Sequence, residues 1–440
     1  MRSASLLAVF LCAATLCAEG ETMSKESSWN VMDFGANADG TTDNTAAFQK
    51  AMDAAGSAGG GVVVAPTGRY AFSGSLTVPN EVVLRGTYAY SPAHAGIRDN
   101  SAEKPEYGSV LLPRDNAGKE DGPPFILLQT NSSLQGFCIF YPDQKPEGPI
   151  PTPYPYAVAM RGNNPAVIDV ELLNPYNGID ASRNQRALIR NIHGQPLHIG
   201  VYVDDIYDIG RIENVHWNPW WSTQKDLFEW QKSNGVAFIF GKADWHYVLN
   251  TFCFGYNVGY KFIETEKGST NGNFLGIGAD DCRTSVLIEQ SAPMGLLITN
   301  GEFVSIDGPD PTMVRVTETN TGTVRFSNCA FWGPCNRNAV IDGKGTVGFG
   351  DCTFVNWSHR KEGCYAIEAT GGSVLVRGCE FKEDKPQVFL GEKVQRAVIT
   401  DNLFQGAKRV KNKSRGVVVI DNNVPTRRKG AKEEKPAAKK

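Results

Sequence analysis

The sequence predicts an all-β fold: a right-handed parallel β-helix of about 10 to 12 coils with a short N-terminal capping α-helix. Three observations predict it: a repeated two-strand unit, a column of bend-forming residues, and ladders of like residues. The unit ends in "VRFSNCAFWG", "VGFGDCTFVN" and "VLVRGCEFKE", which share one order of apolar residues, a bend residue, Cys and Phe. A period of about 22 to 29 residues is typical of a solenoid, in which each repeat buries its apolar face against the next.

The second strand of each unit carries the columns. One column holds residues that tolerate a left-handed backbone and therefore suit a bend between strands. Its members are Asn191, Asn214, Asn250, Asn300, Asn328, Asp351, Gly378 and Asp401. The next position and the position two residues further are predicted to point inward, where like residues stack at the roughly 4.8 Å spacing of neighbouring strands. These columns are Ile192, Val215, Cys329, Cys352 and Cys379, and then Trp217, Phe303, Phe331, Phe354, Phe381 and Phe404.

The start of the chain has the pattern of an export signal. Residues 1–20 contain a single Arg2, the apolar run "LLAVFLCAATLCA" and small residues, as in a cleaved secretory signal peptide. We therefore expect a secreted, periplasmic or cell-surface protein. No later run reaches the roughly 18 apolar residues of a membrane span, so no span is expected. A net charge of −3 argues against a dedicated nucleic-acid binder.

The segment after the signal predicts the cap that a solenoid needs at its end. Asp43 is a natural N-cap for a helix over 44–55, whose apolar residues share one face. The triple glycine at 59–61 ends the helix, and a strand begins at 62–64.

This segment, "NVMDFGANADGTTDNTAAFQKAMDAAGSAGGGVVVAPTGRY", resembles the N-terminal signature of the pectate lyase superfamily. The superfamily contains polygalacturonases, other glycoside hydrolases and polysaccharide lyases on a parallel β-helix. The resemblance covers residues 29–86, and it implies the fold more strongly than the reaction. For Asp33, Asp39 and Asp43 we expect structural roles.

The domain organisation follows from these elements. Residues 29–423 are expected to form a single β-helix domain, with its N-terminal cap at 29–86. The basic end "PTRRKGAKEEKPAAKK" has almost nothing to bury, so 424–440 are expected to be a disordered tail. For the cysteines beyond the signal we expect stacked free thiols, with a bridge such as Cys335 to Cys364 as the alternative.

Function is sought on outward-facing positions of the first strands. By alternation these include Asp180, Tyr202, Asp204 with the adjacent Asp205, Lys261 and Glu289. Asp180 and Asp204 are predicted on neighbouring coils, roughly 5 to 8 Å apart, where two carboxylates perform acid/base cleavage of a glycosidic bond. In the alternative interpretation, these carboxylates only bind turn amides or solvate the surface.

Aromatic residues form the second candidate feature. The long interval "NPWWSTQKDLFEWQKSN" carries Trp220 and Trp221, and His216 and Trp245 lie nearby in the sequence. Exposed aromatic faces stack on sugar rings, so we predict that this loop borders a glycan cleft. The alternative is that the tryptophans seal the loop onto the flank of the solenoid.

Further resemblances give other candidates. "NPYNGID" and "GADDC" look like two polygalacturonase elements, which makes Asp280 and Asp281 second-choice catalytic residues, although the later Gly-His-Gly and Arg-Ile-Lys segments are missing. A pectate-type lyase would instead use Ca²⁺, carboxylates such as Asp204 and Asp205, and a basic residue, Lys261 or Arg211. His193 and His216 share an outward column, and solvated positions are favoured there over a two-histidine metal site.

Three functional classes therefore remain. The first is a secreted glycoside hydrolase that cleaves a polysaccharide or oligosaccharide by carboxylate catalysis, with no metal or other cofactor expected. The second is a Ca²⁺-dependent polysaccharide lyase. The third is a non-catalytic glycan-binding surface protein, since a rigid β-helix needs no chemistry. The sequence leaves the oligomeric state open.

Overall fold

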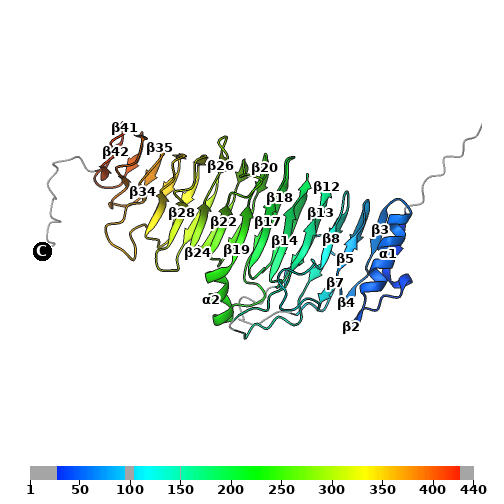
Figure 1. The fold of residues 1–440 in the computed structure, drawn as a ribbon. Coiled ribbons are helices and arrows are strands. Elements are labelled where there is room, and N and C mark those ends of the chain that lie inside the picture. The colour runs from blue at the N-terminus through cyan, green and yellow to red at the C-terminus, as the bar shows by residue number, and fades with distance from the viewer. Residues whose placement is uncertain (1–26, 95–103, 149, 427–440) are drawn as a thin grey trace, which may run out of the picture.

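A computed structural model describes residues 27–94, 104–148 and 150–426. The molecule is an elongated stack of coils that runs from the helix α1 at one end to the last strands at the other (Figure 1). All paired strands of its two large sheets run parallel, and each strand pairs with strands of the adjoining coils. The predicted parallel β-helix is therefore confirmed. The predicted signal peptide at 1–20 lies outside the described residues.

One side of the stack, here called sheet B, contains thirteen strands within the described ranges. With one strand for each coil, the solenoid is longer than the 10 to 12 coils predicted, because the segment before Ala157 also forms coils. The strands are β5 (Leu76–Val78), β8 (Ile126–Leu128), β11 (Tyr156–Met160), β14 (Asn177–Ser182), β17 (Ile199–Asp204), β19 (Val236–Phe240), β22 (Val258–Phe262), β25 (Thr284–Ile288), β28 (Thr312–Val316), β31 (Arg337–Ile341), β34 (Ile367–Ala369), β37 (Val388–Leu390) and β40 (Val410–Asn412).

The other side, sheet A, contains twenty-seven strands in the described part and consists of two rows that meet at a bend. The first row comprises β1 (Ser28–Asn30), β3 (Gly61–Val64), β6 (Val82–Arg85), β9 (Ser133–Gln135), β20 (His246–Leu249), β23 (Gly272–Leu275), β26 (Leu296–Thr299), β29 (Thr323–Ser327), β32 (Thr346–Gly350), β35 (Ser373–Arg377), β38 (Arg396–Thr400) and β41 (Val417–Asp421). The second comprises β2 (Asp39–Asp43), β4 (Gly68–Phe72), β7 (Ser109–Pro113), β10 (Cys138–Ile139), β21 (Phe252–Phe254), β24 (Gly278–Cys282), β27 (Glu302–Ser305), β30 (Ala330–Phe331), β33 (Thr353–Phe354), β36 (Glu380–Phe381), β39 (Leu403–Phe404) and β42 (Val424–Pro425).

Three long strands span both rows: β13 (Ala166–Leu172), β16 (Leu188–Gly194) and β18 (Arg211–Trp217). A separate two-stranded sheet pairs β12 (Gly162–Asn163) with β15 (Asn184–Gln185) at the edge of the stack. The middle coils therefore have a continuous outer surface on the side of sheet A.

The bend column has the backbone conformation that was predicted. All eight residues have a positive φ, for example 55° at Asn191, 52° at Asn328 and 66° at Gly378. Asparagine side chains also connect successive bends, as where Asn328 Nδ2 donates to Asn300 Oδ1 at 2.8 Å. The short polar side chain thus tolerates the left-handed turn and links one coil to the next.

The two inward columns form the core of the C-terminal half. Phe331 stacks on Phe354 with ring centroids 5.1 Å apart, and Phe354 on Phe381 at 4.7 Å. Cys329 and Cys352, in the preceding column, are buried beside them. All eight described cysteines are buried free thiols, in agreement with the preferred prediction, and the alternative bridge between Cys335 and Cys364 is not formed.

The N-terminal cap is confirmed, with small shifts of its boundaries. A 3-10 helix (Val31–Phe34) leads into β2, and α1 spans Thr45–Ser57 and buries Phe48 and Met52 over the first coil. The predicted N-cap is wrong by one residue, because the N-cap is Asn44 and its side chain makes no capping hydrogen bond. Asp43 Oδ1 accepts from the Thr45 amide at 3.0 Å, so this carboxylate still has the expected structural role at the start of the helix. At the other end of the molecule, β42 extends the solenoid to Pro425, two residues past the predicted limit.

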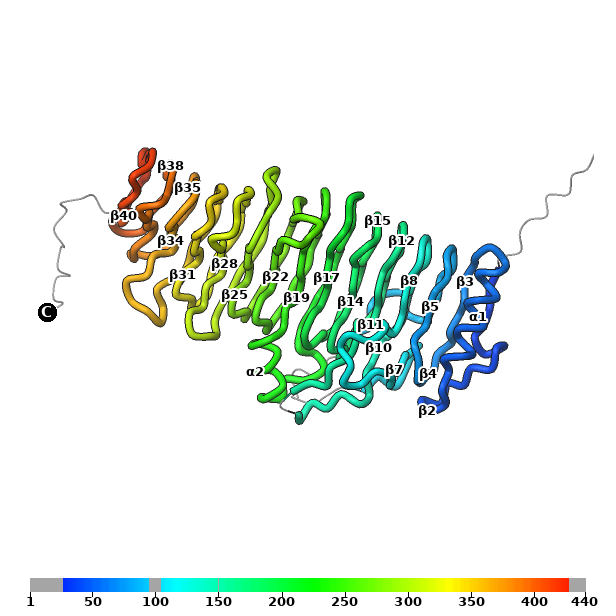
Figure 2. Tube along the Cα trace, viewed as in Figure 1, coloured from blue at the N-terminus to red at the C-terminus, as the bar shows by residue number. Residues whose placement is uncertain are grey.

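A second helix interrupts the middle coils and was not predicted. In the interval interpreted as a loop, α2 (Lys225–Asn234) projects from the stack beside the segments around β7 and β10 (Figures 1 and 2). Its Leu227 packs in a small hydrophobic cluster outside the solenoid, together with Trp221 and Leu197. This cluster is separate from the main core and lies on the outer surface of sheet A.

Candidate functional site

The outward positions of sheet B meet over five neighbouring coils. Asp180 lies opposite Tyr202 in register, Tyr202 opposite Ile239, and Ile239 opposite Lys261. Asp204 lies opposite Ser182, so it is diagonal to Asp180 instead of directly beside it. An open groove of about 500 Å³ covers these positions. Its lining residues are Tyr156, Asp180, Ser182, Arg183, Ile199, Tyr202, Asp204, Asp205, Ile239, Lys261, Ile263 and Lys267.

Asp180 faces an arginine from the preceding coil. Arg161 forms an ion pair with the Asp180 carboxylate and also donates to the backbone carbonyl of Ser182 at 3.0 Å. The other Asp180 oxygen accepts from the Ser182 amide at 3.0 Å. Protein groups therefore neutralise and orient Asp180 in this structure.

Asp204 accepts hydrogen bonds at both of its carboxylate oxygens. Its Oδ1 accepts from the Lys242 amide at 2.7 Å and from the Thr265 hydroxyl at 2.9 Å, and its Oδ2 accepts from the Tyr202 hydroxyl at 3.2 Å. A Cβ on Gly241 would lie 2.6 Å from Oδ1, so a larger residue there would displace the carboxylate. These contacts suit a positioning group, because donors already occupy both oxygens.

Asp205 differs from its two neighbours. It lines the groove with a φ of 58°, in the left-handed region, at the turn that follows β17. Among the described residues, no hydrogen bond or ion pair holds its carboxylate. Of the three predicted catalytic carboxylates, Asp205 is therefore the one available to a ligand.

Two tyrosines supply hydroxyl groups to the same groove. Burial, followed by the negative charges of Asp204 and Asp180, raises the pKa of Tyr202 to about 12. Burial and Asp180 also raise the pKa of Tyr156. Both phenols therefore stay protonated at neutral pH and can donate a proton or a hydrogen bond.

Basic side chains give the groove a mixed charge. Arg183, Lys261 and Lys267 line it, and Lys261 forms a 3.0 Å ion pair with Glu289 on the next coil. Lys261 and Glu289 are thus neighbours on the outward face, where alternation placed each of them. Sequence reasoning missed Arg161, Arg183 and Lys267, because each follows a strand end whose position depends on the turn between coils.

The predicted aromatic wall does not border this groove. Trp221 is only 1% exposed and belongs to the outer hydrophobic cluster, so it offers no surface to a sugar. Trp220 packs on His216, with ring centroids 4.7 Å apart, on the outer surface of sheet A. The alternative interpretation, in which these tryptophans seal the loop onto the solenoid, is the one that the structure supports.

Other predicted residues also lie elsewhere. Trp245 is 62% exposed and lines a separate open groove of about 700 Å³ with Met294 and Leu297. Arg211, proposed as a base for a lyase, is on β18 of sheet A and does not line the sheet B groove.

Asp280 and Asp281, the second-choice pair, lie on β24 of sheet A near α2. Burial raises the pKa of Asp281 to about 6, against the opposing effect of Lys232, whose Nζ is 4.0 Å away. Lys232 is paired more closely with Asp307, at 2.5 Å. This charged cluster connects α2 to the coils and is separate from the groove.

His193 and His216 are half-buried, whereas the favoured interpretation placed them in solvent. They lie side by side in register beneath Trp220, and each has one buried ring nitrogen without a hydrogen-bond partner. Burial and the adjacent His193 lower the pKa of His216 to about 4. Glu171 occupies the same column one coil earlier, and the sequence prediction missed this carboxylate.

Within the described ranges, neither helix has the length and apolar character needed to span a bilayer.

Comparisons with known proteins agree with this fold. A family model for rhamnogalacturonase A/epimerase, pectate lyase-like, matches residues 28–104. Mannuronan C5-epimerase AlgE1 of Azotobacter vinelandii is 59% identical over 65 residues, covering 13% of this chain and 5% of the relative. AlgE6 of the same organism is 46% identical over 83 residues, covering 17% of this chain and 9% of the relative. Alginate lyase 7, also of Azotobacter vinelandii, is 59% identical over 46 residues, covering 10% of this chain and 5% of the relative. The matches thus span less than a tenth of each relative's length.

Solved structures match over most of the chain at low identity. The N-terminal fragment of bacteriophage phi29 gene product 12 has a TM-score of 0.54 at 15% identity, and covers 89% of this chain and 72% of that one. A mutant of DFA-IIIase from Arthrobacter chlorophenolicus A6 has a TM-score of 0.52 at 10% identity, and the match covers 90% of this chain and 98% of that one. The fold and the N-terminal match together support a pectate lyase-like superfamily of parallel β-helix proteins.

Proposed function

We propose that this protein is an enzyme that processes an acidic polysaccharide in the groove of sheet B. The observation that carries the proposal is the composition of the groove: Arg183, Lys261 and Lys267 beside Asp205 and Tyr202. The basic groups would bind the carboxylates of a uronic-acid chain, since a cation favours a nearby anion. The same lining also holds three acidic side chains, so the proposal depends on where Arg183, Lys261 and Lys267 lie and not on a net positive charge.

The reaction that this groove supports best is removal of the proton next to a uronate carboxyl group. A cation paired with that carboxyl group makes the proton more acidic, and Asp205 is the carboxylate available to accept it. The electron pair left on the carbon either expels the neighbouring glycosidic oxygen, which yields an unsaturated sugar, or takes a proton back on the other face. Tyr202, which is protonated at neutral pH, gives its proton to the departing glycosidic oxygen in the first case and to the carbon in the second.

The relatives support this choice of reaction class. The matched proteins are named mannuronan C5-epimerases and an alginate lyase, and both names denote chemistry at a uronic-acid chain. The similarity covers the N-terminal segment and not the coils that form the groove, so the assignment depends on the groove residues themselves.

Hydrolysis of a glycosidic bond is the second candidate, because the groove holds the three predicted carboxylates Asp180, Asp204 and Asp205. A hydrolase needs two of them to exchange protons with substrate and water. Arg161 neutralises Asp180, and three donors hold Asp204. This arrangement favours proton abstraction over a two-carboxylate hydrolysis.

The test is an assay of purified protein on acidic chains, mannuronan and alginate among them, and on neutral chains, with and without EDTA. Three signals are read together: ultraviolet absorbance of unsaturated uronides, reducing ends, and deuterium incorporated at C5 from heavy water. We expect absorbance or deuterium on an acidic chain only. Reducing ends without either signal would establish a hydrolase, and silence in all three would favour a binding scaffold.

Two variants connect the activity to the groove. Asp205→Asn is expected to abolish turnover while the fold, followed by circular dichroism, is unchanged. Asp342→Asn is the matched control, because Asp342 also follows a sheet B strand but lines a different depression near the C-terminal end. Full activity of Asp205→Asn would remove this residue from the mechanism.

A further inference from the structure

A short segment crosses the outer surface of sheet A on the far side from the groove. Residues 87–94, here called the covering segment, are held to the coils by polar contacts. The Ser91 hydroxyl donates to the Val170 carbonyl at 2.9 Å, and Asn214 Nδ2 donates to the Tyr90 hydroxyl at 2.8 Å. The outward side chains beneath this segment are therefore enclosed between it and the strands.

Three of these enclosed side chains belong to adjacent strands in register. Cys138 on β10 lies opposite Glu171 on β13, and Glu171 lies opposite His193 on β16. Cys138 and Glu171 are each 0% exposed. A thiol and a carboxylate thus share a closed space, although neither belongs to the core of the solenoid.

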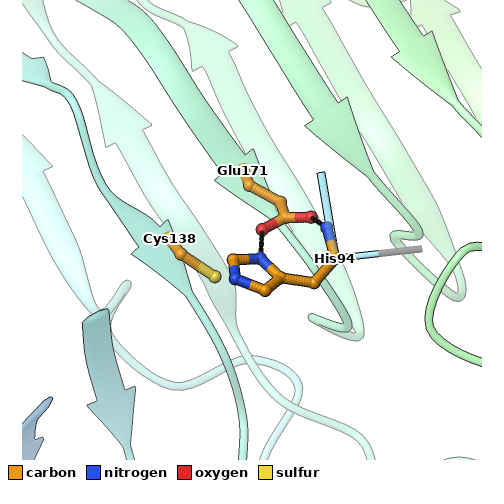
Figure 3. A group of neighbouring side chains, drawn as sticks. All are labelled: His94, Cys138 and Glu171. Atoms are coloured by element: carbon orange, nitrogen blue, oxygen red, sulfur yellow. Dashed lines mark hydrogen bonds and ion pairs between the residues drawn. The ribbon is translucent and has the colours of Figure 1, made fainter. Parts of the chain in front are cut away.

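His94 completes the cluster from the covering segment. Its ring Nδ1 lies 2.5 Å from Glu171 Oε2, and its backbone amide donates to Glu171 Oε1 at 2.7 Å. Figure 3 shows Glu171 on one side of the imidazole and the Cys138 sulfur on the other. Potential ligand atoms of the three residues all lie within 4.8 Å of one another.

The electrostatics of this arrangement favour a bound cation. A completely buried carboxylate is costly unless it is compensated, and here it adjoins a second group that can become an anion. Burial first, and then Glu171, raise the pKa of the Cys138 thiol. The adjacent His193 has a buried Nδ1 without a hydrogen-bond partner. A dication that takes the place of the thiol proton would compensate the resulting thiolate together with the carboxylate.

We propose that Cys138, Glu171 and His94 bind a divalent transition-metal ion of the zinc type, which fastens the covering segment to the solenoid. Binding releases the thiol proton and the proton shared by Glu171 and the His94 ring, so two protons leave as one dication enters. The set of sulfur, nitrogen and oxygen ligands suits zinc or cobalt and does not suit calcium, which takes oxygen ligands.

The closed surroundings argue for an ion and against a catalytic thiol. A thiol, an imidazole and a carboxylate also form the nucleophilic arrangement of some hydrolases. Such a site must admit a substrate to the sulfur, but the Cys138 side chain has no exposed surface. An ion needs no such opening once it is bound.

The test uses the whole protein after treatment with a strong chelator. Co²⁺ is titrated in, and the thiolate-to-cobalt charge-transfer absorption in the near ultraviolet is recorded. We expect one equivalent of Co²⁺ to bind and to produce this absorption. Zn²⁺ should displace the Co²⁺ and remove the absorption, whereas an excess of Ca²⁺ should leave the absorption unchanged. The affinity of the site for Co²⁺ is expected to increase with pH, because the ion competes with two protons.

Variants identify the ligands. Cys138→Ser is expected to eliminate the charge-transfer absorption, whereas Cys253→Ser is the matched control, since Cys253 is an equally buried thiol inside the solenoid. His94→Ala removes a ligand whose side chain is 20% exposed at the edge of the cluster, so the fold should tolerate it, and we expect affinity to fall by more than about tenfold. No stoichiometric uptake, or an unchanged absorption in Cys138→Ser, would overturn the proposal.

Discussion

The roles of single residues depend on the partners that the coil arrangement brings to them. Alternation along a strand predicted that Asp180, Tyr202, Asp204 and Lys261 face outward, and all four line one groove. It could not predict which carboxylate is available, because Arg161 and Thr265 approach from neighbouring coils through turns of variable length. Side-chain direction is a local property, whereas the surroundings of a charge depend on the register of whole coils.

Tyr202 offers the most direct residue-scale test of the proposed chemistry. Tyr202→Phe removes the proton donor but keeps the ring, so we expect kcat to fall about 100-fold with little change in KM. The measurement is steady-state kinetics on the best acidic substrate. Tyr207→Phe serves as the control, because Tyr207 is 54% exposed and lies outside the groove lining. An unchanged kcat in Tyr202→Phe would show that another group delivers the proton.

The stability of the protein is expected to depend on pH through Asp281, whose carboxyl group is buried near α2. The pKa of Asp281 is about 6 in the folded protein and 3.8 for the free side chain. Between these values the folded state binds more protons than the unfolded state, so this residue makes stability fall as pH rises from about 4 to 6. We expect Asp281→Asn to raise the free energy of unfolding by about 1 kcal/mol above pH 7, after allowance for solvent screening, and to change little near pH 4.

Denaturant unfolding at several pH values checks this expectation. Asp307→Asn should instead lower the free energy of unfolding above pH 7. The hydrogen bond from Lys232 lowers the pKa of Asp307 and so favours the ionised form of this residue in the folded protein. If Asp281→Asn lowers the free energy of unfolding at all pH values, the contacts of Asp281 stabilise the folded state by more than the burial of its charge destabilises it.

At the scale of elements, the repeat was the most predictable part of the molecule. The bend column was correct at each of its eight positions, since few residue types accept a positive φ. In contrast, α2 was missed because its sequence "KDLFEWQKSN" follows Trp220 and Trp221 and itself contains a tryptophan, which suggested an exposed loop. Leu227 in the outer cluster and the ion pair of Lys232 with Asp307 hold the helix, and the sequence of the segment alone does not reveal these contacts.

Substitution at one bend separates the backbone effect from the side-chain effect. Asn328 has a φ of 52°, which alanine accepts poorly and glycine accepts freely. We expect Asn328→Ala to lower the free energy of unfolding by about 1 kcal/mol more than Asn328→Gly, although both lose the hydrogen bond to Asn300. Urea unfolding measures the difference. Equal losses would mean that the asparagine ladder, and not the turn, is what the column requires.

At the scale of the whole molecule, the strand pairs of the two large sheets join only adjoining coils in the described part of the chain. Phe354 is completely buried between Phe331 and Phe381, so Phe354→Ala should cost about 3 to 5 kcal/mol. Because a solenoid is stabilised by nearest-neighbour interfaces, hydrogen exchange should accelerate mainly in the coils around β33. Strands β14 and β17 should keep their protection. Uniform acceleration along the chain would show that the stack unfolds as one cooperative unit.

The pairing pattern of sheet B also has a consequence for how such a chain can change in length. Among the residues that the structure describes, five consecutive coils, from β11 to β22, supply the strands that line the groove. Whole coils can therefore be added or deleted towards the C-terminal end while the groove stays intact. Deleting only part of a coil would put every later strand out of phase with its neighbours, so the core residues beyond that point would face the solvent.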